Sequence, residues 1–438
     1  MKETSQKQKS VWSATSAIRK FPKLEKNMNT DVLIIGGGMA GILCAYMLDQ
    51  AGVDYLLVEA ETIGSGMTKN TIAKLTVQHG LIYQKLISRF GVEKAGLYCQ
   101  ANQEALKKYT ELCAGMDCDF EEKDSYVYSL DHPQLIDNEM DALHKLNIPA
   151  EFESRTALPF PVAGAVRFAH QAQFHPLKFM QEIAKKLHIY EHTMVRKLQG
   201  NCAWTESGTI TADQIIVTTH FPFLNRHGSY FLKMFQHRSY VIALDHAPDV
   251  NGMYVDEAEK GLSLRNYNGL LLIGGGDHRT GKKGGNWAEL RQFADQYYPD
   301  AKERWHWAAQ DCMTLDEIPY IGNYSKWTPN LYVATGFNKW GMTSSMVSAM
   351  LLADRIAGKE NPYASVFSPS RSMLRLQLAV NAVEATKNLL TPTVPRCPHL
   401  GCALKWNETE HSWDCPCHGS RFDEDKRLIN NPAMKHLK

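Results

Sequence analysis

The stretch Asp31-Val-Leu-Ile-Ile-Gly36-Gly-Gly38-Met-Ala-Gly41 decides the fold of this 438-residue chain. The apolar run after Asp31 predicts a buried strand, and the apolar run 42–50 after the glycines predicts a helix. Gly36, Gly38 and Gly41 therefore occupy a strand-to-helix turn with the spacing G-x-G-x-x-G. Such a turn lets the backbone approach a pyrophosphate, which sits at the positive N-terminus of the helix. The stretch predicts a dinucleotide-binding α/β domain.

A second predicted strand, 55–59, supports this interpretation. It ends in Glu59, 18 residues beyond Gly41 (59 − 41), where a carboxylate can accept hydrogen bonds from the ribose hydroxyls of an adenosine. The glycine spacing alone is weak evidence, because glycine-rich turns also occur in α/β domains that bind no nucleotide. Together with Glu59 it favours a dinucleotide.

Two further segments extend the pattern. Residues 63–76 read Ile-Gly-Ser-Gly-Met-Thr-Lys-Asn-Thr-Ile-Ala-Lys-Leu-Thr, and residues 331–343, Leu-Tyr-Val-Ala-Thr-Gly-Phe-Asn-Lys-Trp-Gly-Met-Thr, form a late glycine-rich strand-to-helix turn. An N-terminal fingerprint with such a late turn resembles the D-amino-acid oxidase and glycine oxidase superfamily of flavoproteins, over roughly residues 28–371. The resemblance implies that the dinucleotide is FAD.

The resemblance also implies which residues contact FAD. The segment 63–76 would run past the pyrophosphate and along the flavin, and Val195 would reach the adenine through its backbone, just before the strand 212–219 that closes the dinucleotide fold. The helix 342–356 would aim its positive end at the flavin. Beyond the fingerprint and Val195, the candidates are Ser65, Gly66, Thr68, Thr71, Gly336, Phe337, Gly341 and Met342.

The segments between these FAD-contacting parts predict a substrate lobe. Helical patterning begins at residue 81, whereas 230–255 and 262–274 alternate as strands do. We expect a Rossmann-like (GR2-type) α/β flavoprotein with an interleaved mixed-sheet substrate lobe that covers the flavin. The expected boundaries are an oxidoreductase domain over 1–375 (FAD-binding segments 28–80, 165–225 and 312–371; substrate lobe 81–164 and 226–311), a linker over 376–395 and a small all-β lobe over 396–438.

The C-terminal lobe carries Cys397-Pro-His399-Leu-Gly-Cys402 and Cys415-Pro-Cys417-His418-Gly-Ser420. Cys397 and Cys415 can hold one iron and His399 and His418 the other, which is the ligand pattern of a Rieske [2Fe-2S] centre. Zinc is the main alternative, because the same four side chains can form a tetrahedral site. The resemblance to the cytochrome bc-complex type of Rieske protein implies a disulfide between Cys402 and Cys417. The lobe has few apolar residues, so we expect it to be fixed against the larger domain.

By analogy with the flavoprotein family, three residues near the flavin are candidates for catalysis: His79, His175 and Arg279. Arg279 could clamp a substrate carboxylate with its guanidinium, or it could form an ion pair with Asp277. His175 could instead cap a helix at Pro176. Amino-acid-oxidising relatives often carry Arg-Pro where this chain has Asp311-Cys312, which weakens the case for an amino-acid substrate.

Charge and hydropathy exclude several classes of partner. The chain has 48 basic and 47 acidic residues, so binding to nucleic acid has no electrostatic support. The first residues lack a secretory apolar region, and the most apolar window, 32–48, is better explained as strand plus helix than as a transmembrane segment. We expect a cytoplasmic location.

These features predict an FAD-dependent oxidoreductase that oxidises a small amine, amino acid or hydroxy acid by hydride transfer to flavin N5. Electrons would then pass singly through the Rieske centre to an acceptor protein or a quinone. One alternative is an oxidase that reduces O2 directly, with a C-terminal metal lobe for structure or redox sensing. A second alternative is a zinc-stabilised docking lobe on a flavoprotein. The sequence does not identify the substrate.

Overall fold

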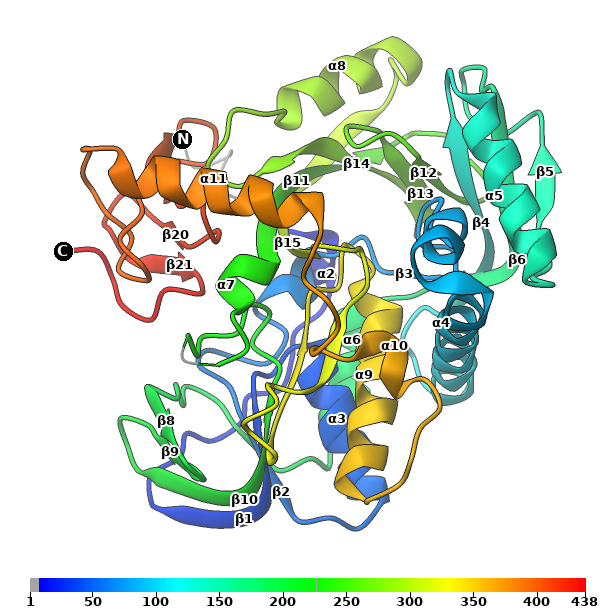
Figure 1. Cartoon of the computed structure of the whole chain (residues 1–438). Helices are drawn as coiled ribbons and strands as arrows, with labels where there is room; N and C mark the ends of the chain where they lie inside the picture. Colours follow the sequence, from blue (N-terminus) through cyan, green and yellow to red (C-terminus); the bar gives the residue numbers. More distant parts are fainter. Residues whose placement is uncertain (1–7, 226) are drawn as a thin grey trace.

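The computed structural model describes residues 8–225 and 227–438. In these residues the strands form an eight-stranded, a nine-stranded and a four-stranded sheet (Figure 1). The first residues, on which the expectation of a missing secretory segment rests, lie mostly outside the described ranges.

The eight-stranded sheet forms the dinucleotide-type core predicted from residues 31–41. Strand β1 pairs in parallel with β10 and β2, and β10 pairs in parallel with β17. The central strands are apolar on both faces because the sheet is covered on both sides. The strand bounds are β1 (Met28–Ile35), β2 (Tyr55–Val58), β7 (Ile189–Tyr190), β8 (Lys197–Gln199), β9 (Cys202–Trp204), β10 (Thr209–Val217), β16 (Tyr320–Asn323) and β17 (Leu331–Thr335).

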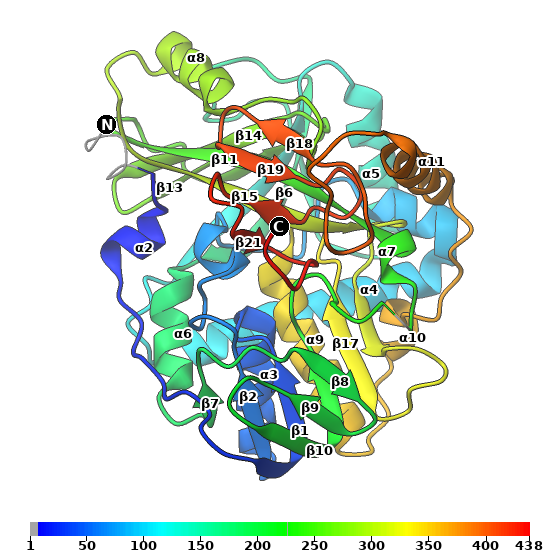
Figure 2. The ribbon, with the colours of Figure 1, turned by 90° about the vertical axis from the view of Figure 1, so that its left-hand side faces the viewer.

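Two helices begin where strands of this sheet end. Helix α3 (Met39–Gln50) follows β1, and α9 (Gly341–Ile356) follows β17. They pack against each other, α3 on β1 and β2 and α9 on β16 and β17 (Figure 2). This arrangement brings both helix N-termini to the carboxyl-end edge of the sheet, where open α/β sheets bind ligands.

The nine-stranded sheet belongs to the second lobe and is mixed, as predicted. Most neighbours are antiparallel, but β12 and β4 run parallel. Helices α4 and α5 come from the segment that begins with helical patterning, and α8 packs on β11 and β14. The bounds are β3 (Lys74–Leu75), β4 (Glu121–Ser129), β5 (Glu151–Glu153), β6 (Gly164–Gln173), β11 (Met234–Asp245), β12 (Met253–Asp256), β13 (Ser263–Tyr267), β14 (Leu270–Arg279), β15 (Lys302–Thr314), α4 (Tyr83–Cys113), α5 (Pro133–Lys145) and α8 (Trp287–Tyr297).

One apolar cluster extends across both lobes. It includes buried side chains of α3, α9 and α4 and of α6 (Pro176–Ala184). The two lobes therefore share a core, which fixes the position of one sheet relative to the other. Short elements complete this part: α2 (Val11–Thr15), the 3-10 helix η1 (Met67–Asn70), α7 (Tyr230–Lys233) and α10 (Ala364–Phe367).

The C-terminal lobe is a four-stranded antiparallel sheet with a small core made largely of cysteines and Phe422. Its strands are β18 (Lys405–Asn407), β19 (Ser412–Asp414), β20 (Arg421–Phe422) and β21 (Leu428–Asn430). Helix α11 (Leu376–Leu390) precedes the lobe and lies beside it (Figures 1 and 2). The segment 376–395, treated above as a linker, is therefore mostly helical.

Within the described residues, no helix combines the length and the apolar composition that a bilayer-spanning segment needs.

Candidate active site and metal centre

A cavity of about 1490 Å³ opens between the two large sheets and reaches the C-terminal lobe. Its volume exceeds that of a typical small-molecule site, so it can hold a dinucleotide together with a small substrate. Most residues predicted to bind the cofactor line it: Gly36, Gly38, Glu59, Ser65, Gly66, Thr68, Thr71, Val195, Phe337, Gly341 and Met342. Gly41 and Gly336 are absent from the lining.

Gly41 and Gly336 lie behind the cavity wall and allow the close packing of the segments that form it. A Cβ at Gly41 would collide with the carbonyl oxygen of Gly36, so only glycine allows the helix to approach the strand so closely. Gly336 has φ of 72°, and a Cβ there would collide with the Thr314 methyl group. Both positions therefore require glycine for packing.

The helix N-termini in the cavity wall provide positive ends that suit FAD. Residues Met39 and Ala40 of the first turn of α3 line the cavity, and so do Gly341 and Met342 at the start of α9. Neither N-cap residue, Gly38 nor Trp340, caps its helix with its own side chain. At α3 the Met39 N–H donates to the Thr68 hydroxyl at 3.1 Å. The positive ends of both helices thus face one open space, which suits a pyrophosphate at α3 and an electron-rich ring edge at α9.

Glu59 is held at the carboxyl end of β2. Its Oε2 accepts a hydrogen bond from the Gly37 N–H at 2.6 Å, and its Oε1 accepts one from the Glu61 N–H at 2.9 Å. Burial raises the pKa of Glu59, and these N–H groups oppose that shift. The bonds fix an acceptor beside the glycine turn, where a ribose-binding carboxylate is required.

His79 lies in the cavity wall and connects it to α9. Its Nε2 is 2.9 Å from the carbonyl oxygen of Thr76 and 2.9 Å from the Thr343 hydroxyl, and its Nδ1 is 2.7 Å from the Tyr98 hydroxyl. Burial lowers the pKa of His79 to about 3, so the ring is neutral. The ring also stacks on Trp340. A role of His79 near the flavin stays a prediction.

His175 does not reach the cavity. Its Nδ1 accepts a hydrogen bond from the Lys178 N–H as the N-cap of α6, and its Nε2 is 3.1 Å from the Thr15 hydroxyl. The side chain is fully buried. This position corrects the expectation of a catalytic role, because one ring nitrogen caps α6, as the capping alternative proposed, and the other contacts Thr15 of α2.

Arg279 is also misplaced for catalysis. Its Nε donates to the Pro416 carbonyl at 3.0 Å, its Nη1 to the Asn381 side chain at 2.9 Å and its Nη2 to the Cys417 carbonyl at 3.3 Å. The expectation that it clamps a substrate carboxylate is corrected, because all three nitrogens bind α11 and the C-terminal lobe. Asp277, its suggested partner, pairs instead with Lys339 at 2.6 Å.

The sequence analysis did not predict a cluster of three polar side chains in the cavity. His237 of β11 and Asp311 of β15 are direct cross-strand partners, and Asp277 of β14 lies on the same cavity face. Asp311 was noted above only as a departure from relatives. The period-two alternation of the strands would have indicated a shared face, but the pairing of β11 with β15 is needed to bring these residues together.

In the C-terminal lobe the predicted metal ligands lie in two matched pairs. The Nδ1 atoms of His399 and His418 are 3.3 Å apart. The thiols of Cys415 and Cys397 contact each other, and this contact lowers the pKa of Cys397. A pair of sulfurs and a pair of imidazole nitrogens, each converging, fit the two irons of a [2Fe-2S] cluster.

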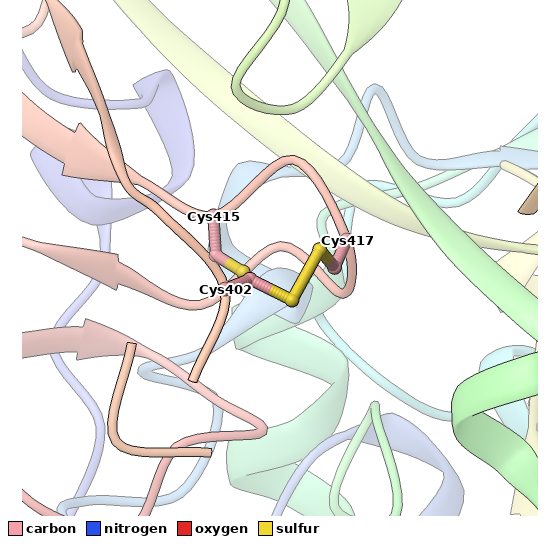
Figure 3. Close-up of side chains that lie close together, drawn as sticks. All are labelled: Cys402, Cys415 and Cys417. Atoms are coloured by element: carbon pink, nitrogen blue, oxygen red, sulfur yellow. A yellow bond between two sulfur atoms is a disulfide. The ribbon is translucent and has the colours of Figure 1, made fainter. Parts of the chain in front are cut away.

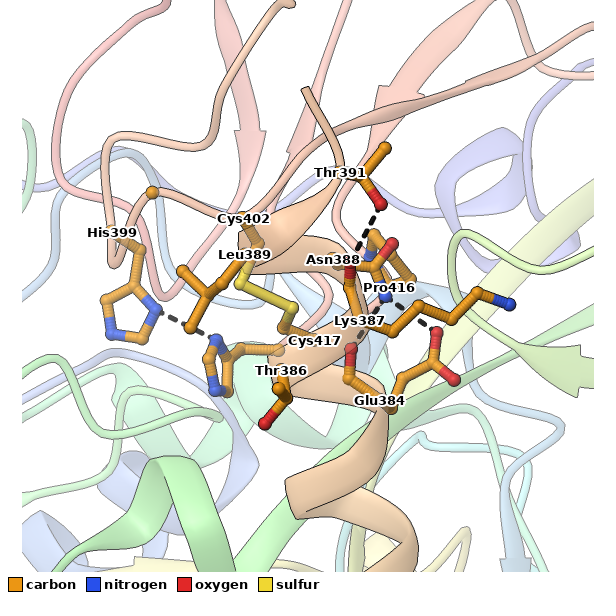
Figure 4. Close-up of a disulfide and its surroundings, with 12 residues drawn as sticks. Glu384, Thr386, Lys387, Asn388, Leu389, Thr391, His399, Cys402, Pro416 and Cys417 are labelled. Carbon is orange, nitrogen blue, oxygen red and sulfur yellow. Dashed lines mark hydrogen bonds between the residues drawn. A yellow bond between two sulfur atoms is a disulfide. The ribbon is translucent and has the colours of Figure 1, made fainter. Parts of the chain in front are cut away.

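Cys402 and Cys417 are joined by a disulfide in the structure, with Cα atoms 6.7 Å apart (Figures 3 and 4). Their sulfurs and that of Cys415 lie within 4.8 Å of one another. The bond therefore ties the two ligand-bearing loops together next to the cluster site.

The C-terminal lobe docks on the nine-stranded sheet. Gln236 of β11 donates to the His418 carbonyl at 2.7 Å, and Gln310 of β15 donates to the Gly419 carbonyl at 2.8 Å. Next to them, Arg238 forms an ion pair with Glu410, with only 4% and 7% of their side chains exposed. The docking surface is therefore buried and specific.

The strands β11 and β15 separate this docking surface from the cavity. Successive side chains of a strand point to opposite faces. Gln236 and Gln310 contact the C-terminal lobe, whereas the next residues along, His237 and Asp311, line the cavity. The metal site and the dinucleotide cavity thus lie against opposite faces of the same two strands.

Comparisons with known proteins agree with both parts of this geometry. The family model for FAD dependent oxidoreductases matches residues 31–355, and the model for the Rieske [2Fe-2S] domain matches residues 371–438. The Bacillus subtilis (strain 168) protein YhfW, a Rieske 2Fe-2S iron-sulfur protein by its name, is 34% identical over 98% of this chain and 96% of its own length. A cytochrome b6-f complex iron-sulfur subunit from Nostoc punctiforme is 39% identical, but over 14% of this chain and 32% of its own length.

Solved structures share the fold of the larger part. Glycine oxidase from Geobacillus kaustophilus has a TM-score of 0.65 at 20% identity and covers 79% of this chain and 99% of its own. L-proline dehydrogenase from P. horikoshii has a TM-score of 0.66 at 15% identity and covers 80% of this chain and 98% of its own. The chain therefore belongs to the FAD dependent oxidoreductase family, carries a C-terminal Rieske [2Fe-2S] domain, and has FAD and a [2Fe-2S] cluster as its cofactors.

Proposed function

We propose that this oxidoreductase oxidises a small amine, amino acid or hydroxy acid and passes the electrons singly through its Rieske centre to an external acceptor. The observation that carries the proposal is the position of the two sites on opposite faces of β11 and β15. Bound FAD supplies the hydride acceptor at its N5 atom. The remaining steps depend on how the chain positions the cluster.

The body of the protein holds the outer edges of both ligand imidazoles. The carbonyl of Phe231 accepts a hydrogen bond from His418, and the Oδ1 of Asn225 lies 2.8 Å from His399 Nε2. The rings of Phe221 and Phe231 lie 6.2 Å from the His418 ring, measured between centroids. These contacts support a cluster that stays fixed at the boundary, with its histidine edge turned toward the flavoprotein.

The electron balance defines the acceptor class. The substrate carbon loses a hydride, which carries two electrons, and the cluster accepts one electron at a time. Two successive transfers are therefore needed to return the flavin to its oxidised form. We propose a one-electron acceptor protein or a quinone as the final acceptor.

Two further features belong to the proposal. We infer that the disulfide Cys402–Cys417 persists in the loaded protein, since it braces both ligand loops. We also propose a cytoplasmic location, which is supported by six free cysteines outside the cluster lobe, as a reducing compartment favours. These are Cys44, Cys99, Cys113, Cys118, Cys202 and Cys312.

The test uses protein purified without oxygen and carrying both cofactors. The flavin is reduced with light and EDTA, and the cluster is followed by low-temperature EPR. We expect the reduced-cluster signal to grow as the flavin bands bleach. In Cys415→Ser the flavin should remain bound and reducible while the signal is lost. A cluster that dithionite reduces, but that reduced flavin leaves oxidised, would contradict the proposal.

Oxygen uptake then separates the relay from a direct oxidase. We expect slow uptake with O2 alone and faster substrate oxidation when a one-electron acceptor is added. Equal rates with and without the acceptor would favour direct reduction of O2 instead.

A further inference from the structure

The polar face of the cavity carries more negative than positive charge. On β11, β14 and β15 this face presents Ser239, His237, Asp277 and Asp311. Lys339, in the turn before α9, also lines the cavity and pairs with Asp277. The ion pair joins Lys339 to Asp277, so this one lysine is shared by two carboxylates, and Asp311 has no ion-pair partner of its own in the part of the chain that the structure describes.

Asp311 is unpartnered within the described residues. It forms no hydrogen bond or ion pair with another described side chain. Burial disfavours its charged form most, Lys339 partly opposes that effect, and the neighbouring Asp277 adds to it. An ionised carboxylate in such a place is expensive unless a cation or several donors approach it. This face of the cavity therefore suits a ligand that brings a cation or several hydrogen-bond donors to Asp311.

His237 provides a second, independent sign of a ligand. Its side chain is 8% exposed and lines the cavity, and its Nδ1 has no hydrogen-bond partner among the described residues. Buried polar atoms in folded proteins nearly always have a partner. Burial, and then the positive charges of Lys339 and Arg279, lower the pKa of His237 to about 3, so the ring is neutral. A neutral imidazole next to Asp311 adds no charge that could hold an anion.

We propose that this face binds the cationic nitrogen of an amine substrate, with Asp311 as the counter-ion and His237 and Ser239 as neutral polar neighbours. The inference rests on the proposed function and narrows its substrate class to cationic amines. Of the cations near this face, Lys339 is bound to Asp277, while Arg238 and Arg279 are bound to the C-terminal lobe. Lys74, which also lines the cavity, donates to the Tyr254 carbonyl and the Ser263 hydroxyl. A substrate carboxylate would therefore meet Asp311 without a free cation to balance it.

The proposal implies a defined pH dependence. The charged groups that face Asp311 are Lys339, Asp277 and, through the sheet, Arg238, and His237 stays neutral beside it. Burial raises the pKa of Asp311 to about 6. Below that pH the carboxyl group is neutral and loses its attraction for a cation. Binding of a cation should therefore strengthen as the pH rises through about 6.

The experiment measures binding to the protein carrying FAD and the cluster, without turnover. Three probes of similar size are compared by titration calorimetry and by shifts of the flavin absorption bands: n-butylammonium, n-butanol and pentanoate. We expect n-butylammonium to bind most tightly. In Asp311→Asn its affinity should fall about 10- to 150-fold, the range for a charge-assisted hydrogen bond. The matched control, Asp213→Asn, removes an exposed carboxylate on β10 and should leave the affinity unchanged.

Several outcomes would overturn the inference: pentanoate binding as tightly as n-butylammonium, no binding of n-butylammonium, or an Asp311→Asn variant with wild-type affinity. If the variant does not fold, the pH titration of the wild-type protein decides, because affinity that stays flat from pH 5 to pH 8 contradicts a role for Asp311. Failure of the proposed function would look different. Reduced flavin would then leave the cluster oxidised, whichever probe is bound.

Discussion

At the scale of the residue, Glu410 is the buried charge that joins the C-terminal lobe to the nine-stranded sheet. It lies between Arg238 of β11 and Arg421 of β20, with Arg421 Nη2 3.0 Å from its Oε2, and all three side chains are at most 7% exposed. Burial alone would raise the pKa of Glu410, but the two guanidinium groups lower it to about 2. The carboxylate is therefore ionised at neutral pH and binds the two domains together.

We predict that Glu410→Gln destabilises the protein by about 3–5 kcal/mol at pH 7, because it leaves the buried Arg238 without its counter-charge. Arg421 loses one of its two carboxylate partners and keeps Asp414. Since the folded-state pKa lies below the usual value of 4.5, the stabilisation is complete above about pH 4.5 and is lost as the pH falls toward 2. The difference in unfolding free energy between variant and wild type should shrink over that range, as measured by urea unfolding. Glu408→Gln, which removes an exposed carboxylate nearby, serves as the control. A difference that does not change with pH would refute the role of this charge.

At the scale of the element, helix α11 fastens the Rieske domain to the flavoprotein through two buried asparagines. Asn381 accepts a hydrogen bond from Arg279 and donates one to the Leu232 carbonyl at 3.2 Å. The carbonyl of Asn388 accepts a hydrogen bond from the Ala403 N–H. The helix therefore bonds both to the segment before β11 and to the first ligand-bearing loop.

Replacing Asn381 by alanine should loosen this attachment. The change leaves a guanidinium nitrogen of Arg279 and the Leu232 carbonyl without a partner, a loss of about 1–3 kcal/mol. We expect faster protease cleavage in the segment 391–396, followed by mass spectrometry of the fragments. Thr386→Ala, at an exposed position of the same helix, should be cut at the wild-type rate. Equal rates for the Asn381 variant would mean that the helix is held by other contacts.

Local sequence patterns predicted the parts of this molecule that local chemistry determines. The glycine turn at 36–41 and the ligand loops at 397–402 and 415–420 are contiguous, so their residue spacing indicated the structure. The roles of His175 and Arg279 depend on Thr15, Asn381 and Pro416, which are far away in the sequence. Pairing across such distances cannot be deduced from periodicity within one segment.

Helix α11 fills most of the segment expected to be a linker, although a helix end was expected near Glu384, and its full extent was not predicted for a related reason. An apolar stripe normally indicates a buried face, but here Leu376 is 91% exposed and Val383 is 68% exposed, whereas the buried positions are the asparagines. The usual relation between apolar pattern and burial is thus inverted. The prolines at 392 and 395 mark the true connection, which is confined to the residues after Leu390.

At the scale of the whole molecule, the cavity and the cluster site are held on opposite faces of the same strands by contacts to both large domains. Gln236, Gln310 and Arg279 of the nine-stranded sheet donate to carbonyls of the second ligand loop. Asn431 of the C-terminal lobe donates to the carbonyls of Thr219 and Phe221 beside the dinucleotide domain. A lobe anchored in this way need not move for an electron to reach it.

We therefore predict that electron transfer from reduced flavin to the cluster does not depend on solvent viscosity. A lobe that swings on a tether must diffuse between positions on the microsecond-to-millisecond scale, so its transfer rate falls as glycerol raises the viscosity. In a docked lobe, the rate of electron transfer is set by the fixed distance between flavin and cluster and by the driving force of the reaction. Flash reduction of the flavin in buffers of increasing glycerol content, with cluster reduction followed optically, measures the difference. The Glu410→Gln variant supplies the contrast. If its transfer rate depends on viscosity and the wild-type rate does not, the Glu410 contacts keep the lobe at a fixed distance from the flavin. A wild-type rate that falls as viscosity rises would instead show that the lobe moves.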